Sequence, residues 1–287
     1  MNTSSGTGGT VTTPAFATPL RLGQHNLPSW ERFEAAMRDI FERRYYTNQG
    51  PLTRAFEERL QTQLGVRHAV CVTNVTIGLM MASEALGMAS PVLVPRICTS
   101  ALTHALNWCG VSTLSVEVDA ASGQLDAGAC AKRVERIGRP GAIVGANLWG
   151  GACDVETLAS LARAHDVPLM FDSSEGFGTT VAGRRAGHGA AIEVFSFDAA
   201  DIVNAGGGAC VATDDDELAA RLRNIRSSYG AGRPVSVVKT SNGRMSEAQA
   251  ALGLLSLDDF DANRARNRAC FEAYRKCLHG VNGIRVV

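Results

Sequence analysis

The sequence predicts an α/β protein in which a mostly parallel sheet is flanked by helices. Short apolar segments with strand character alternate with helical patterns up to Asp172, and from about Asp215 the pattern becomes purely helical. The chain has 287 residues, enough for one large or two modest domains. In open parallel sheets ligands bind at the carboxyl ends of the strands, so a functional site is expected at that edge.

Each expected element follows from its local pattern. Residues 54–64 place Phe56, Leu60 and Leu64 on one face of a helix. Strands and helices then alternate: strand 68–73, helix 76–86, strand 90–95, helix 101–110, strand 112–118, helix 129–137, strand 142–148, helix 156–166 and strand 167–171. A strand and turn beginning at residue 195 precede a capped helix over 216–230, and 246–278 are expected to be helical.

Composition narrows the classes of function. The chain has 28 basic and 28 acidic residues, so charge gives no case for a nucleic-acid partner. Its eight cysteines form no C-x-x-C pair, which favours a reducing cytoplasm over disulfides or a zinc site. No apolar run is long enough to span a bilayer, so no membrane partner is expected. Residues 1–20, rich in Gly, Ser and Thr, read as a disordered tail.

Few residues indicate chemistry by themselves. Asp172 follows an apolar strand, where it fits either a ligand site or an ordinary turn or cap. Thr76 begins a helix after a strand, where it fits either a phosphate site or a simple N-cap. Ser196 has no nucleophile elbow around it, and the six histidines show no metal-ligand spacing. The residues alone therefore predict a crevice suited to phosphate, and no metal.

A longer set of segments resembles one known family. YYTNQGPLTRAFEERLQTQLGVRHAVCVTNVTIGL, ANLWGGACDVETLASLA, LMFDSSEGFGTT, VFSFDAAD and SNGRMSEAQAALGLL follow one another as in the DegT/StrS nucleotide-sugar aminotransferases. The resemblance runs from about residue 25 to the end. It implies a dimeric, fold type I pyridoxal phosphate (PLP) enzyme. It also implies a large domain over 21–235 and, over 236–287, the helical start of a shortened C-terminal small domain.

Several cofactor-binding positions of the family find matches. Asp172 resembles the carboxylate that pairs with the pyridine nitrogen of PLP. Val75 and Thr76, in N-V-T, resemble the turn that cradles the phosphate, and Ser196 in F-S-F resembles the phosphate-binding serine. Asn242 resembles the asparagine that reaches the phosphate site of the neighbouring subunit. The resemblance thus implies a cradle for a phosphorylated pyridine.

Other positions depart from the family pattern. The family reads F-S-F-H-x-x-K, with the lysine forming the Schiff base, whereas this chain has Asp201 at that place. Glu175 stands where His or Gln is usual, and Thr99 aligns with an aromatic residue that stacks on the ring. A carboxylate cannot condense with an aldehyde, so ordinary transamination is not expected. If Asp172, Glu175 and Asp201 share one pocket, their mutual repulsion favours a bound cation.

Two functions remain open from these residues, beside a third in which the scaffold carries a new reaction without any pyridoxal cofactor. In the first, the protein binds PLP or pyridoxamine phosphate (PMP) without a covalent bond, with Asp201 pairing with the amine of PMP or acting as a base in lysine-independent biosynthetic chemistry. In the second, it is a non-catalytic pseudoenzyme that serves as partner or regulatory subunit of an active aminotransferase. A homodimer or heterodimer and a small-molecule ligand, such as a nucleotide sugar, fit both. Another lysine is not expected to replace the missing Schiff-base lysine, because only Lys239 of the three lysines lies in a segment expected near a partner's site.

Overall fold

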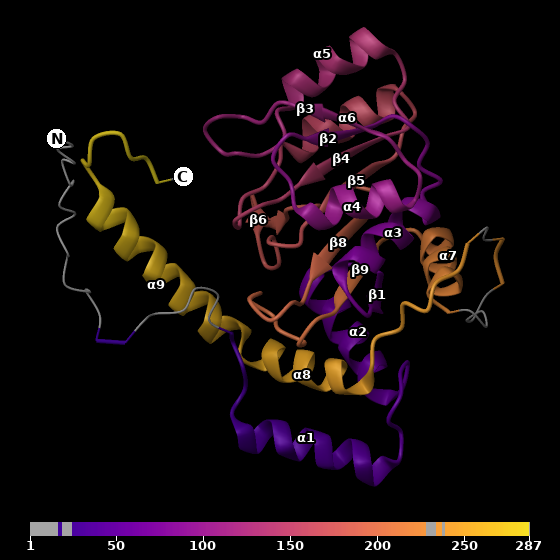
Figure 1. The fold of residues 1–287 in the computed structure, drawn as a ribbon, viewed down its shortest axis with the longest axis vertical. Helices are drawn as coiled ribbons and strands as arrows, with labels where there is room; N and C mark the ends of the chain where they lie inside the picture. Colours follow the sequence, from indigo (N-terminus) through magenta and orange to yellow (C-terminus); the bar gives the residue numbers. More distant parts are fainter. Residues whose placement is uncertain (1–16, 19–24, 228–233, 237–238, 287) are drawn as a thin grey trace, which may run out of the picture.

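A seven-stranded sheet forms the centre of the molecule (Figure 1) in the computed structural model, which describes residues 17–18, 25–227, 234–236 and 239–286. The strand order is β1-β9-β8-β5-β4-β2-β3. Its strands are β1 (His68–Val72), β2 (Val92–Pro95), β3 (Thr113–Val116), β4 (Ala142–Ala146), β5 (Leu169–Asp172), β8 (Ile192–Ser196) and β9 (Ala209–Thr213). A separate two-stranded ribbon joins β6 (Thr180–Val181) to β7 (Arg184–Arg185).

The strands from β8 through β3 run parallel, whereas β9 is antiparallel to both of its neighbours, β1 and β8. The expected mostly parallel sheet flanked by helices is therefore confirmed. The carboxyl ends of β2, β4, β5 and β8 meet at one edge, as parallel pairing requires. That edge holds the site described below.

Helices cover both faces of the sheet (Figure 1). The helices of the described residues are α1 (Trp30–Arg43), α2 (Pro51–Leu64), α3 (Val75–Ala85), α4 (Ser100–Trp108), α5 (Ala127–Ile137), α6 (Val155–Ala164), α7 (Asp216–Arg226), α8 (Glu247–Asp258) and α9 (Phe260–Leu278). Of these, α1 packs on α8 and α9 extends away from the sheet (Figure 1). One apolar core lies between the sheet and α3, α4 and α7, a second involves α2 and α8, and a third involves α5 and α6. Such two-sided covering explains the almost continuously apolar strands.

Side-chain caps mark where several helices begin. Asn74, Asp126 and Asp154 each accept a backbone N–H of the first turn, and Ser246 forms a capping box with Gln249 at the start of α8. Thr76 is the second residue of α3, so the simple N-cap role considered for it is wrong and belongs to Asn74.

Some of the structure was not expected from the sequence. Helix α1 and the β6–β7 ribbon were not predicted, and Asp172 is the last residue of β5 and not the first residue after it. Helix α9 extends away from the sheet in Figure 1, and Phe260 and Asn263 are its buried residues.

Some predictions stay untested. The predicted tail over residues 1–20 lies outside the described residues except at positions 17 and 18. Residues 228–230, the end of the helix expected to follow Asp215, also lie outside them. The proposed division near residue 235 stays a prediction. Within the part of the chain that the structure describes, no helix is long and apolar enough to cross a membrane.

Candidate functional site

Asp172 is the most buried of the candidate residues. It ends β5 in the middle of the sheet and has no exposed surface. Oxygen Oδ2 accepts the hydroxyl of Thr99 at 2.6 Å, and Oδ1 accepts both the backbone N–H of Ser174 at 3.1 Å and the hydroxyl of Ser174. Burial raises the pKa of Asp172, these three donors oppose that rise, and the nearby charge of Glu175 adds to it.

Asp201 lies in the connection between β8 and β9. Its carboxylate accepts the backbone N–H of Asp198 at 2.7 Å, and its own N–H donates to the carbonyl of Asp198 at 3.0 Å, which closes a tight turn. Burial raises the pKa of Asp201, a hydrogen bond with Ser196 lowers it, and the charges of Asp198 and Glu175 raise it. Asp201 is therefore a carboxyl group that takes up a proton more readily than an exposed one.

The same connection contains three consecutive glycines whose backbone has positive φ angles, a conformation that only glycine adopts easily. Gly206, Gly207 and Gly208 have φ values of 66, 107 and 123°. This backbone brings the chain back to β9, where Ala209 pairs with Ser196. Ser196 is itself buried at the end of β8, and its hydroxyl accepts the N–H of Asp198 at 3.3 Å.

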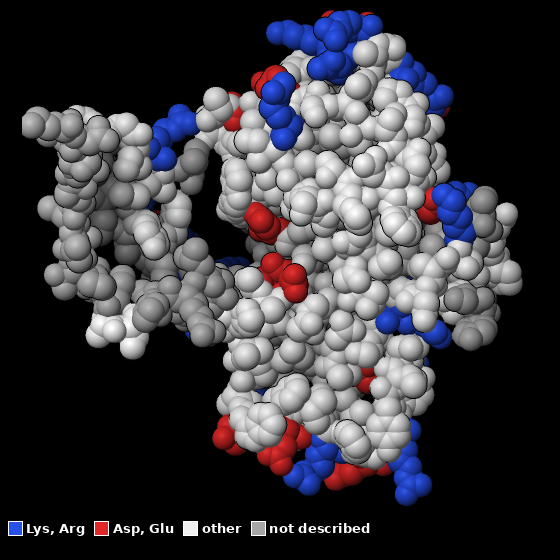
Figure 2. All heavy atoms as spheres, in the orientation of Figure 1, with Lys and Arg blue, Asp and Glu red and all other residues white. Residues whose placement is uncertain are grey.

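A cavity of 730 Å³ brings Glu175 and Asp201 together. Its other lining residues are Trp149, Gly150, Ser174, Phe177, Gly178, Thr179, Ala200, Ile202 and, from α9, Arg264, Asn267, Arg268 and Phe271. The exposed Glu175 accepts the N–H of Trp149 at 3.0 Å. Acidic groups thus lie on the sheet side of this cavity and basic groups on the side of α9. In Figure 2 two acidic patches lie near the middle of the face, while most other charges gather toward its ends.

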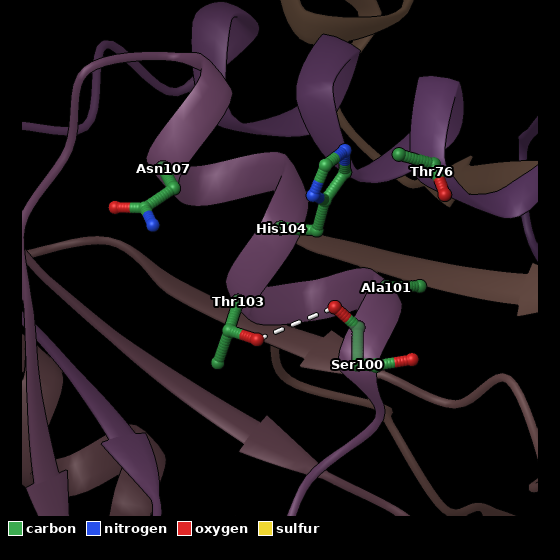
Figure 3. A pocket seen from close by; sticks show the side chains of 6 residues that line it. All are labelled: Thr76, Ser100, Ala101, Thr103, His104 and Asn107. Carbon is green, nitrogen blue, oxygen red and sulfur yellow. Dashed lines mark hydrogen bonds between the residues drawn. The ribbon is translucent and has the colours of Figure 1, made fainter.

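Thr76 lines a different pocket. This space of 480 Å³ is bounded by Thr76 of α3 and by Ser100, Ala101, Thr103, His104 and Asn107 of α4 (Figure 3). The pocket is polar, since it presents three hydroxyls, an imidazole and an amide. Val75, Asp172, Ser196 and Asn242 line neither of these two cavities, so only Glu175 and Asp201 of the predicted site residues share one. Asn242 is exposed, and its side-chain oxygen accepts hydrogen bonds from Arg244 at 2.9 and 2.7 Å.

The three lysines, all within the described residues, lie away from Asp201. Lys239 forms an ion pair with Glu84 at 2.6 Å, Lys132 is exposed on α5, and Lys276 lines another pocket on α9. None of them lines the cavity that contains Asp201. In the described residues, therefore, no lysine of this chain lies in the same cavity as the Asp201 carboxylate.

Sequence reasoning missed a buried ion pair behind the site. Glu193 on β8 pairs with Arg185 at 2.5 Å and accepts the hydroxyl of Ser173, the residue after Asp172, also at 2.5 Å. Asn147 donates to the same hydroxyl at 2.8 Å. This network fixes the turn that follows β5. In the sequence, the two serines that follow Asp172, Ser173 and Ser174, were the one signal that could have indicated a hydrogen-bond network at this turn.

Sequence reasoning also missed the basic side chains of α9 and the role of Thr99 as a donor. A lone threonine or a surface arginine carries no recognisable pattern in a single sequence. Groups that could hold a metal ion, with at least three His, Cys, Asp or Glu side chains, are absent from the described residues.

Known proteins resemble this chain over most of its length. The model of the DegT/DnrJ/EryC1/StrS aminotransferase family matches residues 29–287. The dTDP-4-amino-4,6-dideoxy-D-glucose transaminase of Shigella dysenteriae is 27% identical over 273 residues, which are 94% of this chain and 73% of that protein. The GDP-perosamine synthase of Caulobacter vibrioides is 30% identical over 232 residues, which are 78% of this chain and 61% of that protein.

A solved structure agrees with these relatives. The crystal structure of DesI in the presence of its TDP-sugar product superposes with a TM-score of 0.89 and 38% identity, over 95% of this chain and 69% of that one. The chain thus spans roughly two thirds of the length of these relatives. The fold, the matched segments and their order lead to one conclusion: the chain belongs to the DegT/DnrJ/EryC1/StrS aminotransferase family.

Proposed function

We propose that this protein binds PLP or PMP without a covalent bond and that Asp201, in place of the Schiff-base lysine, prevents ordinary transamination. Its homologues are PLP-dependent aminotransferases. The observation that carries the proposal is that Asp201 lies with Glu175 in one cavity that none of the three lysines lines. This supports the proposal that an acidic group stands where the family pattern has an amine.

The buried carboxylate of Asp172 fits the pyridine ring of this cofactor. A carboxylate has about four acceptor sites, and Asp172 uses three, which leaves one that would accept the N–H of a protonated ring nitrogen. Because Asp172 has no exposed surface, the ring would reach this site only after a local opening beside β5. When bound, the ring accepts electrons from a bond that breaks on the substrate. Asp172 would keep the ring nitrogen protonated. The non-covalent part of the cradle therefore fits the cofactor, whereas the covalent attachment point does not.

The phosphate group would be held by the residues that the resemblance assigns to it. Thr76 and Val75 lie in the first turn of α3, where backbone N–H groups lack intrahelical partners and favour an anion. Ser196 supplies a buried hydroxyl at the end of β8. The exposed Asn242 is available to the neighbouring subunit of a dimer.

Asp201 and Glu175 make one wall of the cavity acidic. Two carboxylates on one wall attract a cation, and an ammonium group satisfies both. This favours PMP, which carries an amine, over PLP, which carries an aldehyde. Since burial raises the pKa of Asp201, this group is also suited to hold a proton and return it during lysine-independent chemistry. The ligand class proposed for the substrate is a nucleotide sugar, as with the TDP-sugar of DesI.

The test measures binding and covalent attachment separately. The purified protein is dialysed with PLP or PMP, followed by absorption spectra, and a second sample is reduced with borohydride and analysed by peptide mass. We expect reversible binding, stronger for PMP, and no stoichiometric adduct on any residue. The variant Asp201→Lys is expected to gain a PLP adduct at position 201, whereas Asp201→Asn gains none. The proposal is wrong if neither vitamer binds, or if one lysine of the unmodified chain is labelled stoichiometrically during amino-group turnover.

The second candidate is the non-catalytic partner of a lysine-bearing homologue. The exposed position of Asn242 favours this as well, because the side chain can serve a neighbouring subunit whatever the chemistry of its own cavity. Co-expression with an intact homologue and size-exclusion chromatography separate the two functions. A stable heterodimer whose activity falls on Asn242→Ala supports the partner role, and a homodimer that turns over substrate by itself contradicts it.

A further inference from the structure

The Thr99 hydroxyl lies between helix α4 and the carboxylate of Asp172. It donates to Oδ2 of Asp172 at 2.6 Å and accepts the backbone N–H of Leu102 at 3.2 Å. Thr99 is thus the N-cap of α4 and at the same time a hydrogen-bond donor to the buried acid. One side chain joins the positive end of a helix to the negative group that ends β5.

The Thr99 hydroxyl is a hydrogen-bond donor that favours the ionised form of Asp172. The hydroxyl and N–H of Ser174 occupy Oδ1, and the Thr99 hydroxyl occupies one of the two acceptor sites of Oδ2. Glu175 acts against ionisation, because it places a like charge near Asp172. The thiol of Cys98, whose pKa is raised mainly through burial and also through the charge of Asp172, stays uncharged and supplies no cation. Burial works in the same direction as Glu175.

We infer that Thr99 is a positioning residue that favours the ionised form of Asp172 and holds its carboxylate in one orientation. In the family pattern this place belongs to an aromatic residue that stacks on the ring. Here the contribution is a hydrogen bond to the acid that would meet the ring nitrogen of a bound cofactor. The effect on Asp172 is a property of the chain itself, and only its benefit to a bound pyridine rests on the function proposed above.

The test follows the Asp172 carboxyl group directly. Protein labelled with ¹³C at the aspartate carboxyl carbons is titrated by NMR, and Asp172→Asn identifies the resonance. In Thr99→Val we expect the titration midpoint to rise by about one pH unit, because a charge-assisted donor is lost. Thr99→Ser keeps the hydroxyl and the original midpoint. Thr103→Val, which removes a hydroxyl that donates to Ser100 in the same helix, is the matched control and leaves the midpoint unchanged.

A further variant separates the cap from the donor. Thr99→Gly removes the hydroxyl donor, adds no charge and costs the N-cap little, so its midpoint is expected to rise about as far as that of Thr99→Val. If Thr99→Val does not fold, the comparison of Thr99→Gly with Thr99→Ser decides. A second readout is the pH below which PMP binding is lost, which moves upward in the same variants.

The outcomes separate this inference from the proposed function. Equal midpoints in Thr99→Val, or in Thr99→Gly, and the unmodified protein overturn the role of Thr99, whether or not a vitamer binds. A raised midpoint in a protein that binds neither PLP nor PMP supports the role of Thr99 and contradicts the proposed function.

Discussion

The carboxylate of Glu247 accepts the hydroxyl of Thr53 at 2.6 Å, across 194 positions of the sequence. It also accepts the backbone N–H groups of Gly50, Leu52 and Thr53 at 2.9, 2.8 and 3.0 Å. A buried acid from the first turn of α8 thereby caps the start of α2. An anion at this place is favoured by the free N–H groups and the positive end of the helix.

Replacing this acid tests how much the α2–α8 contact stabilises the fold. We expect Glu247→Ala to lower the free energy of unfolding by about 2–4 kcal/mol, because four donors lose a buried, charged acceptor. Thermal and urea unfolding measure the change. Glu58→Gln, at an exposed position of α2, is the control and is expected to stay within about 0.5 kcal/mol of the unmodified protein. An equal loss in both variants would refute the capping role.

The ionisation of Asp201 predicts a pH-dependent gain from Asp201→Asn. Because the pKa of this buried carboxyl is raised in the folded state, its contribution favours folding at low pH and is lost as pH rises through the folded pKa. Asparagine keeps an acceptor for the N–H of Asp198 but carries no charge. The melting temperature of the variant, relative to the unmodified protein, should therefore increase from about pH 4 to about pH 8. A constant difference across this range would contradict the assigned cause.

The buried pair of Arg185 and Glu193 predicts strong non-additivity. Arg185→Met leaves Glu193 buried without its cation and should cost about 3–5 kcal/mol in unfolding free energy. The double variant with Glu193→Met is expected to be more stable than Arg185→Met alone, since it removes both charges. Urea unfolding of the full double-mutant cycle measures the coupling. The neighbouring exposed Arg184→Met is the control, and a double variant as unstable as the sum of the singles would exclude coupling.

Glu175 is predicted to set the preference between the two vitamers. Glu175→Gln keeps an acceptor for the N–H of Trp149 but removes one of the two acidic groups that line the cavity. We expect affinity for PMP to fall by about two- to fivefold, as for a charge on an exposed group, while affinity for PLP changes less. Fluorescence titration with each vitamer gives the ratio. Glu135→Gln on α5 should leave it unchanged, and an unaltered ratio in Glu175→Gln would remove the electrostatic explanation.

Local signals predicted most of the fold and part of the site. The expected strand over 68–73 and helix over 76–86 match β1 and α3, because apolar periodicity and a capping residue act within a few positions. The insertion of antiparallel β9 between β1 and β8 was not visible, because it joins segments far apart in the chain. The resemblance supplied Asp172 and Asp201 as site positions, but no short-range pattern indicates what surrounds them.

The contacts that tune the site lay outside what a single sequence reveals. Thr99 meets Asp172 across 73 positions, and this requires the return of the chain after β2 and β5 to one edge of the sheet. The raised pKa of Asp201 depends mainly on burial and less on the charges of Asp198 and Glu175, and the burial of this side chain has no sequence signature. The predicted phosphate positions Val75, Thr76, Ser196 and Asn242 remain predictions.

The loop that carries Asp201 leaves the sheet at Ser196 and re-enters it at Ala209, and these two residues face each other as ladder partners. Both anchor points belong to central strands, so the tip of the loop is presented from a rigid base whatever side chain occupies it. A single replacement in this loop, such as Asp201→Lys, changes the chemical group at the tip while the strand pairing at both anchor points stays the same. A change of chemistry is therefore easier to reach by mutation here than a change of shape.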